Sequence, residues 1–212
     1  MNNTSVTNGE GGQTANSPAT LERLLTEMIR YPDRREELTK AIEETFGQQK
    51  AVLVLDMSGF SRTTQRLGIV SFLMMIHQMR LICRPCVEER NGKVIKAEAD
   101  NLLCLFETVD DAVYATREMI QRLDAANQVL PAENHLYAAF GIGYGNVLNI
   151  GDEDIFGDEM NLASKLGEDI ARPGEILLTM AAQANLKETD IKTREEGVSI
   201  SGLSLFYYLV EA

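Results

Sequence analysis

The chain has 212 residues, of which 44 % are hydrophobic and 25 % charged, proportions typical of a globular protein with one sizeable core. Its 32 acidic residues outnumber 20 Lys and Arg, and the net charge of −12 argues against nucleic acid or an anionic membrane surface as the main partner. We find no apolar run long enough for a membrane segment, no signal-peptide pattern at the amino-terminal residues, and only three cysteines. These features lead us to expect a cytoplasmic protein.

The amino-terminal part of the sequence predicts a polar tail followed by a helical extension. Residues 1–19 are mostly small and polar, with little to bury, so we expect a disordered tail. Residues 20–48 carry apolar side chains at helical spacing, interrupted at Pro32. These apolar residues are Leu21, Leu24, Leu25, Met28, Ile29, Leu38, Ile42 and Phe46. We expect this extension to pack on the main domain or on a partner chain.

The main domain, residues 49–212, is expected to begin with the apolar run AVLVLD at 51–56, which has the length of a strand. The elements predicted after it are a helix over 61–90 with a break near Gly68, a hairpin of 93–98 and 102–106 turning at 99–101, a helix over 110–127, two strands within 136–150 around Gly145-Asn146, a helix over 159–170, a strand over 175–179 and a hairpin over 198–210. This order predicts an α+β fold with a ferredoxin-like βαββαβ core, in which helices cover one face of an antiparallel or mixed sheet.

Two aspartates stand where predicted strands end. Asp56 closes the first strand, and Asp100 lies in the turn of the hairpin expected to pair beside it. Two close carboxylates repel each other, and a divalent cation relieves that repulsion; ligands that are all oxygen suit Mg²⁺ or Mn²⁺. The alternative, that both aspartates only cap turns, remains open on this spacing alone.

Four blocks of sequence resemble a known family. They are DMSGF at 56–60, IKAEAD at 95–100 followed by NLLCLF, EDIFGDEMNLASKL at 153–166, and GEIL at 174–177. In this order they resemble the signature blocks of class III nucleotidyl cyclases, the adenylate and guanylate cyclase catalytic domain, over about residues 50–180.

The resemblance implies a role for ten residues. Asp56, Asp100 and the backbone carbonyl of Met57 would hold two Mg²⁺ or Mn²⁺ ions. The backbone amides of Ser58, Gly59 and Phe60 would bind the triphosphate. Lys96 and Asp154 would read the edge of adenine, and Asn161 would orient the ribose. Lys165 stands where the family usually has an arginine that stabilises the transition state.

The resemblance further implies an adenylate cyclase that converts ATP to 3′,5′-cyclic AMP and pyrophosphate by a two-metal mechanism. The active unit would be a head-to-tail homodimer in which one chain supplies Asp56 and Asp100 and the other supplies the base- and ribose-binding residues. We expect no nucleic-acid partner and no membrane segment.

Two departures from the family pattern keep other functions open. Lys165 has the charge of an arginine but lacks the planar guanidinium group that binds two oxygens at once. Ala99 precedes Asp100 where the family often has glycine. The alternatives are a weak or inactive cyclase-fold module that binds nucleotide or metal in signalling, and a cyclase for another nucleoside triphosphate.

Overall fold

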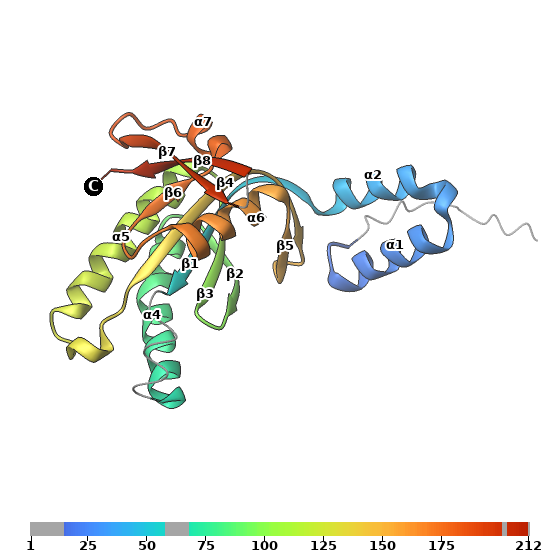
Figure 1. Cartoon of the computed structure of the whole chain (residues 1–212). Helices are drawn as coiled ribbons and strands as arrows, with labels where there is room; N and C mark the ends of the chain where they lie inside the picture. The colour runs from blue at the N-terminus through green and yellow to red at the C-terminus, as the bar shows by residue number, and fades with distance from the viewer. Residues whose placement is uncertain (1–14, 58–67, 201–202, 212) are drawn as a thin grey trace, which may run out of the picture. The chain divides into compact units, whose positions relative to one another are not determined.

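The computed structural model of the chain describes residues 15–57, 68–200 and 203–211 (Figure 1). The chain divides between Phe46 and Gly47 into two units, each with its own internal contacts. Within the described ranges, no helix is both long and apolar enough to cross a membrane.

The first unit consists of helices, as the periodicity predicted. Its elements are α1 (Pro18–Arg30), a 3₁₀ turn η1 (Pro32–Arg34) and α2 (Arg35–Phe46). The first helix begins within the segment expected to be a tail, because the Ser17 hydroxyl accepts a hydrogen bond from the Thr20 backbone N–H and Pro18 suits a first turn. The tail prediction for residues 1–14 lies outside the described residues.

The second unit is a mixed sheet with helices. Its elements in chain order are β1 (Gly47–Met57), α4 (Ile69–Glu89), β2 (Lys93–Glu98), β3 (Asn101–Phe106), α5 (Val109–Asn127), η2 (Ala132–Asn134), β4 (Ala138–Ile150), β5 (Asp154–Phe156), α6 (Asp158–Ser164), a π-helix η3 (Lys165–Ile170), β6 (Ile176–Leu178), α7 (Met180–Ala184), β7 (Thr193–Ile200) and β8 (Leu203–Val210). The strand order is β2-β3-β1-β4-β6-β8-β7, with β5 paired to β4. The pairing of β4 with β6 is parallel, and each other pairing is antiparallel. The first four strands with α4 and α5 form the expected ferredoxin-like core, so the α+β prediction is confirmed.

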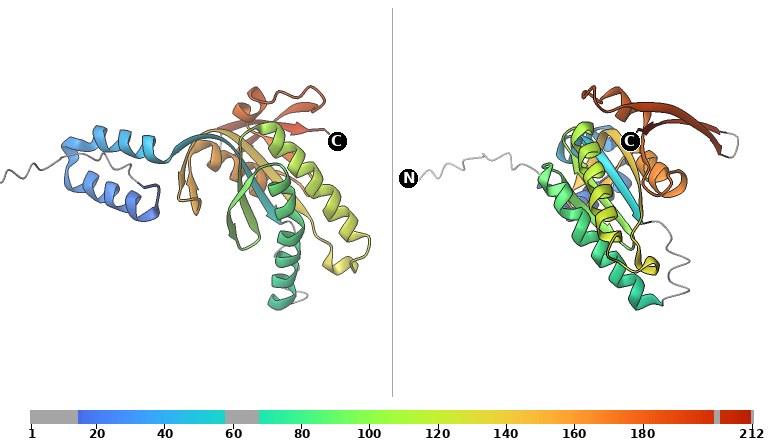
Figure 2. Two further views of the ribbon diagram at one scale, coloured as in Figure 1. Left: turned by 180° about the vertical axis from the view of Figure 1, so that it is seen from behind. Right: turned by 90° about the vertical axis from the view of Figure 1, so that its left-hand side faces the viewer.

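Helices cover both faces of this sheet, which corrects the expectation of helices on one face. In β1, Leu53 and Leu55 belong to the core under α4 and α5, whereas Val52 and Val54 pack with Ala163 of α6 on the opposite face. Figure 2 shows α4 and α5 on one side of the strands and α6 on the other. The physical reason is that β1 is apolar at consecutive positions, so both of its faces must be shielded from water.

The prediction of two strands around Gly145-Asn146 is wrong. The strand β4 runs through both residues, which pair with Lys50 and Gln49 of β1. The chain reverses only after Ile150, where Gly151 and Asp152 have φ of 61° and 58°. A glycine-asparagine pair therefore did not mark a turn here.

The glycines of β4 instead allow a helix to lie directly on the strand. A Cβ atom added to Gly141 would stand 2.0 Å from the backbone oxygen of Ala163, and one added to Gly143 would stand 2.5 Å from that of Glu159. The Glu159 side chain adds two contacts, since its Oε2 accepts hydrogen bonds from the Tyr144 backbone N–H at 3.1 Å and the Thr179 hydroxyl at 2.6 Å. The helix α6 is thus held against β4 by main-chain contact.

The remaining boundaries follow the sequence closely. The helix α4 begins directly after Gly68 and continues through Pro85 to Glu89. The final hairpin begins at Thr193, five residues earlier than expected, and its expected turn at Gly202 lies outside the described residues.

Candidate active site

The ends of β1 and β2 bring the two predicted aspartates to one edge of the sheet. Asp56 is paired across the β1–β3 ladder with Asn101, the residue that follows Asp100. The Met57 backbone N–H donates to the Asp100 carbonyl at 3.2 Å. The turn between β2 and β3 contains only Ala99 and Asp100, and Ala99 adopts the left-handed region with φ of 45°. The ladder between β1 and β3 therefore places Asp100 beside the end of β1.

Negative charge accumulates at this edge. Burial, followed by the charges of Asp100 and Glu168, raises the pKa of Asp56 to about 7. Burial also raises the pKa of Glu168, with contributions from Asp169 and Asp100. A carboxylate whose neighbours are acidic rather than basic is stabilised in its charged form by a cation. Among the described residues, however, no group of three or more His, Cys, Asp or Glu side chains is arranged to hold a metal ion. The two aspartates would therefore need other oxygen ligands.

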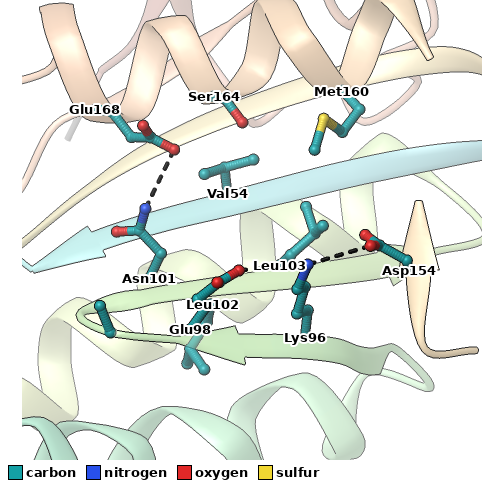
Figure 3. A pocket seen from close by; sticks show the side chains of 11 residues that line it. Val54, Lys96, Glu98, Asn101, Leu102, Leu103, Asp154, Met160, Ser164 and Glu168 are labelled. Atoms are coloured by element: carbon teal, nitrogen blue, oxygen red, sulfur yellow. Dashed lines mark hydrogen bonds and ion pairs between the residues drawn. The ribbon is translucent and has the colours of Figure 1, made fainter. Parts of the chain in front are cut away.

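A cavity of about 240 Å³ lies between the sheet and α6 (Figure 3). Its floor is apolar, with Val54 and Leu103, and Met160 of α6 faces them from above. Polar side chains stand at both ends of the cavity. The cavity therefore has the character of a site for a flat ring with polar edges.

One end of the cavity contains Lys96 and Asp154, as the resemblance implied. The Lys96 ammonium donates to Asp154 Oδ2 at 3.1 Å and lies 3.3 Å from Glu98 Oε2. The hydrogen bonds from Lys96 to Asp154 and Glu98 raise the pKa of the ammonium group. Asp154 begins β5, and its Oδ1 accepts from the Ile155 backbone N–H at 2.9 Å. The structure thus brings together two residues that are 58 positions apart in the sequence.

The other end of the cavity contains Asn101 and Glu168, which the sequence reasoning missed. Asn101 Nδ2 donates to Glu168 Oε1 at 3.2 Å, and Asn101 Oδ1 is buried without a hydrogen-bond partner among the described residues. Asn101 follows the predicted turn aspartate directly, and the β1–β3 ladder pairs it with Asp56. Glu168 gave no such signal, since it belongs to a π-helix whose i→i+5 bonds change the angle between successive side chains.

The structure does not bring Asn161 and Lys165 into this cavity. Asn161 is exposed on α6, and Lys165, the first residue of the π-helix, lies 3.3 Å from Asp169 in an ion pair. The expected phosphate-binding residues Ser58, Gly59 and Phe60 lie outside the described residues. A single chain therefore assembles the Lys96–Asp154 pair and the two aspartates, whereas Asn161 and Lys165 lie outside the cavity.

No family model matches the chain. Among curated proteins, it is 28 % identical over 129 residues to "Putative adenylate cyclase 3" of Rhizobium meliloti (strain 1021), a match that covers 61 % of this chain and 22 % of that protein. It is 27 % identical over 134 residues to the serine/threonine-protein kinase pkn2 of Myxococcus xanthus, covering 63 % of this chain and 16 % of the kinase. The chain therefore spans less than a quarter of the length of these two relatives.

Solved structures give a consistent result for the fold. The catalytic core of a rhodopsin-guanylyl cyclase with converted specificity, in complex with ATPαS, superposes with a TM-score of 0.66 at 16 % identity, covering 78 % of this chain and 98 % of that one. The adenylyl cyclase CyaB from P. aeruginosa superposes with a TM-score of 0.62 at 23 % identity, and the match covers 78 % of this chain and 96 % of CyaB. The adenylate/guanylate cyclase/hydrolase from Silicibacter pomeroyi superposes with a TM-score of 0.63 at 23 % identity, and the match covers 77 % of this chain and 96 % of that one.

The chain has the fold of class III nucleotidyl cyclase catalytic domains, and the resemblance noted in its sequence is confirmed. The similar structures include both adenylyl and guanylyl cyclases, so they support the class without distinguishing between the two bases.

Proposed function

We propose that this chain is the catalytic domain of an adenylate cyclase that converts ATP to 3′,5′-cyclic AMP and pyrophosphate. The observation that carries the proposal is the Lys96–Asp154 pair at one end of a cavity with apolar walls. An ammonium group has three N–H donors, and contacts to Asp154 and Glu98 use two of them. The pair therefore offers one further donor beside a carboxylate that still accepts.

That arrangement complements adenine. Adenine has a ring-nitrogen acceptor next to an exocyclic amine donor, whereas guanine has a carbonyl oxygen in place of that amine. Guanine would therefore set an acceptor against the Asp154 carboxylate, and an unpaired buried polar group costs about 1–3 kcal/mol. We expect ATP to be preferred over GTP by at least about tenfold, since ~1.4 kcal/mol corresponds to a factor of ten.

The size of the cavity supports a composite site. About 240 Å³ is below the ~300–1,000 Å³ of typical pockets for whole ligands, so it suits a base rather than a complete nucleoside triphosphate. Asn161 and Lys165 lie outside it, although the proposed reaction needs groups at the ribose and the α-phosphate. A head-to-tail homodimer would supply them, because a twofold axis sets the Lys96, Asp154, Asn161 and Lys165 of one chain against the Asp56 and Asp100 of the other.

The carboxylate edge fits two Mg²⁺ or Mn²⁺ ions. Its oxygen ligands would be those of Asp56, Asp100 and the Met57 backbone, and its carboxylates repel one another. Asn101 adds a buried acceptor that has no partner within the described part of the chain. Such ions, when bound, supply acidification of the ribose 3′-hydroxyl and neutralisation of phosphate charge. In the proposed dimer, Lys96 and Asp154 of one chain hold the base, so that the ribose and α-phosphate have a fixed position relative to Asp56 and Asp100 of the other chain.

A second candidate function is a module that binds nucleotide with little turnover. It is favoured by Lys165, which replaces the usual arginine and whose charge is already paired with Asp169 at 3.3 Å. Such a module would retain the base-binding pair Lys96–Asp154 and the carboxylate edge with Asp56 and Asp100, but would stabilise the transition state poorly.

The test is to incubate purified protein with Mn²⁺ and each of the four nucleoside triphosphates and to identify cyclic products. We expect cyclic AMP from ATP, a rate with GTP lower by at least about tenfold, and no product from Asp56→Asn. The matched variant Lys96→Met should lose most of this preference but keep the metal edge. Nucleotide binding without a cyclic product would favour the second candidate, and equal use of ATP and GTP would contradict the base assignment.

A further inference from the structure

The Asn101 side chain has an unusual position at the carboxylate edge. It is paired with Asp56 across an antiparallel ladder, in which the Cβ atoms of opposite residues are about 4.5–5.5 Å apart and point to the same face. Asn101 therefore stands on the same side of the sheet as Asp56, next to Asp100 in sequence. Any cation held at this edge lies within reach of its side chain.

The orientation of the Asn101 amide is fixed by Glu168. A carboxylate accepts hydrogen bonds, so the amide turns its NH₂ group to Glu168 Oε1 at 3.2 Å. Figure 3 shows the nitrogen directed at Glu168 and the oxygen directed away from it, toward the carboxyl end of β1. Among the residues that the structure describes, Asn101 Oδ1 is buried and has no hydrogen-bond partner.

A buried acceptor without a donor is costly to maintain, and this acceptor lies beside carboxylates, which cannot donate when ionised. A cation satisfies all of these oxygens at once, and amide oxygens are common ligands of hard divalent ions. Building on the proposed function, we propose that Asn101 Oδ1 is a further oxygen ligand of the divalent ion at Asp56 and Asp100, and that Glu168 is the positioning residue that orients it.

The competing explanation is structural, in which the Asn101–Glu168 bond only fastens the π-helix to β3. The two explanations differ in what they predict for metal binding by folded protein. The experiment is a titration of the whole chain with Mn²⁺ at pH 8 without nucleotide, followed by the electron paramagnetic resonance signal of free Mn²⁺. Urea unfolding of each variant reports stability separately.

We expect Asn101→Leu, which keeps the size of the side chain and removes its oxygen, to weaken Mn²⁺ binding by about tenfold. Glu168 is exposed, and Glu168→Ala should weaken Mn²⁺ binding similarly, because the Asn101 amide is then free to rotate. Glu168→Gln should rescue most of the affinity, since its amide oxygen still accepts from Asn101. Asn185→Leu, at the end of α7 and away from the cavity, is the control and should bind as wild type does.

The outcomes separate this inference from the proposed function. Loss of binding in Asp56→Asn with unchanged affinity in Asn101→Leu and Glu168→Ala would overturn the role of Asn101 and leave the metal edge in place. Lower stability of those two variants at unchanged Mn²⁺ affinity would likewise show a structural bond only. Unchanged affinity in Asp56→Asn, or no binding by wild type, would refute the metal edge and the inference together.

Discussion

Replacement of Asp56 by Asn should stabilise the metal-free chain, and the gain should grow as the pH rises. In the folded chain, burial and the charges of Asp100 and Glu168 raise the pKa of Asp56 to about 7, whereas an unfolded chain leaves it at its ordinary value of 3.8. The folded state therefore holds this proton more tightly. The free energy of unfolding falls as the pH rises from about 4 to about 7, because Asp56 ionises less readily in the folded state than in the unfolded state. Above that range, Asp56 contributes no further pH dependence.

The magnitude follows from the size of this pKa difference. The interval from 3.8 to about 7 corresponds to about 4 kcal/mol if the carboxyl group were fully shielded. Asp56 is only partly buried, and water screens its charge, so we expect about half of that value. Asparagine has nearly the same shape and never ionises. The advantage of Asp56→Asn should therefore be about 2 kcal/mol larger at pH 8 than at pH 4.5.

The assay is urea unfolding of wild type and Asp56→Asn at both pH values in the presence of EDTA. Asp124→Asn, a change at an exposed aspartate of α5, is the matched control for the loss of one carboxylate. An advantage of Asp56→Asn that is equal at the two pH values, or a loss of stability at pH 8, would refute the description of Asp56 as a repelled carboxylate.

Three further predictions test the turn, the helix contact and the composite site. Ala99→Gly should raise the free energy of unfolding by about 1 kcal/mol, because Ala99 has φ of 45°, and a decrease in urea unfolding would contradict this. Gly141→Ala should lower it by about 1–3 kcal/mol, since the new Cβ would stand 2.0 Å from a backbone oxygen of α6; an unchanged melting curve would disprove that contact. A mixture of the inactive variants Asp56→Ala and Asn161→Ala should recover about a quarter of wild-type cyclase activity, because about half of randomly mixed dimers are mixed and each has one intact site. If the mixture stays inactive despite subunit exchange, the site is not shared between chains.

The order of the core elements was predictable from residues alone, because local patterns determine it. The run at 51–56 has the length and apolar character of a strand buried on both sides, and the hairpin over 93–106 has a polar turn between two β-rich runs. The pairing of Asp56 with Asn101 belongs to the ladder between β1 and β3, which are not consecutive strands, so no local pattern determines its register. The Lys96–Asp154 pair was expected only through the family resemblance, because no local pattern links residues 58 positions apart.

Other features depend on tertiary contacts that no local pattern encodes. Gly145 suggested a turn, but glycine also leaves room for a neighbouring side chain, and a Cβ atom at Gly145 would stand 2.8 Å from Cγ of Glu159 in α6. The position of Glu168 depends on the π-helix, which a periodicity of 3.6 residues does not predict. The presence of helices on both faces of the sheet was not predictable for a similar reason, because an uninterrupted apolar strand does not indicate which elements cover each of its sides.

The contact between β4 and α6 has a consequence for how this chain can change. The helix is located by main-chain atoms meeting at Gly141 and Gly143, so its position does not depend on the side chains it presents outward. Replacement of the Asn161 or Lys165 side chain would therefore leave the backbone contact with β4 in place. The outward side chains of α6 and of the π-helix that follows it can therefore vary independently of the architecture, and an exchange of lysine for arginine at position 165 would not require the sheet to adapt.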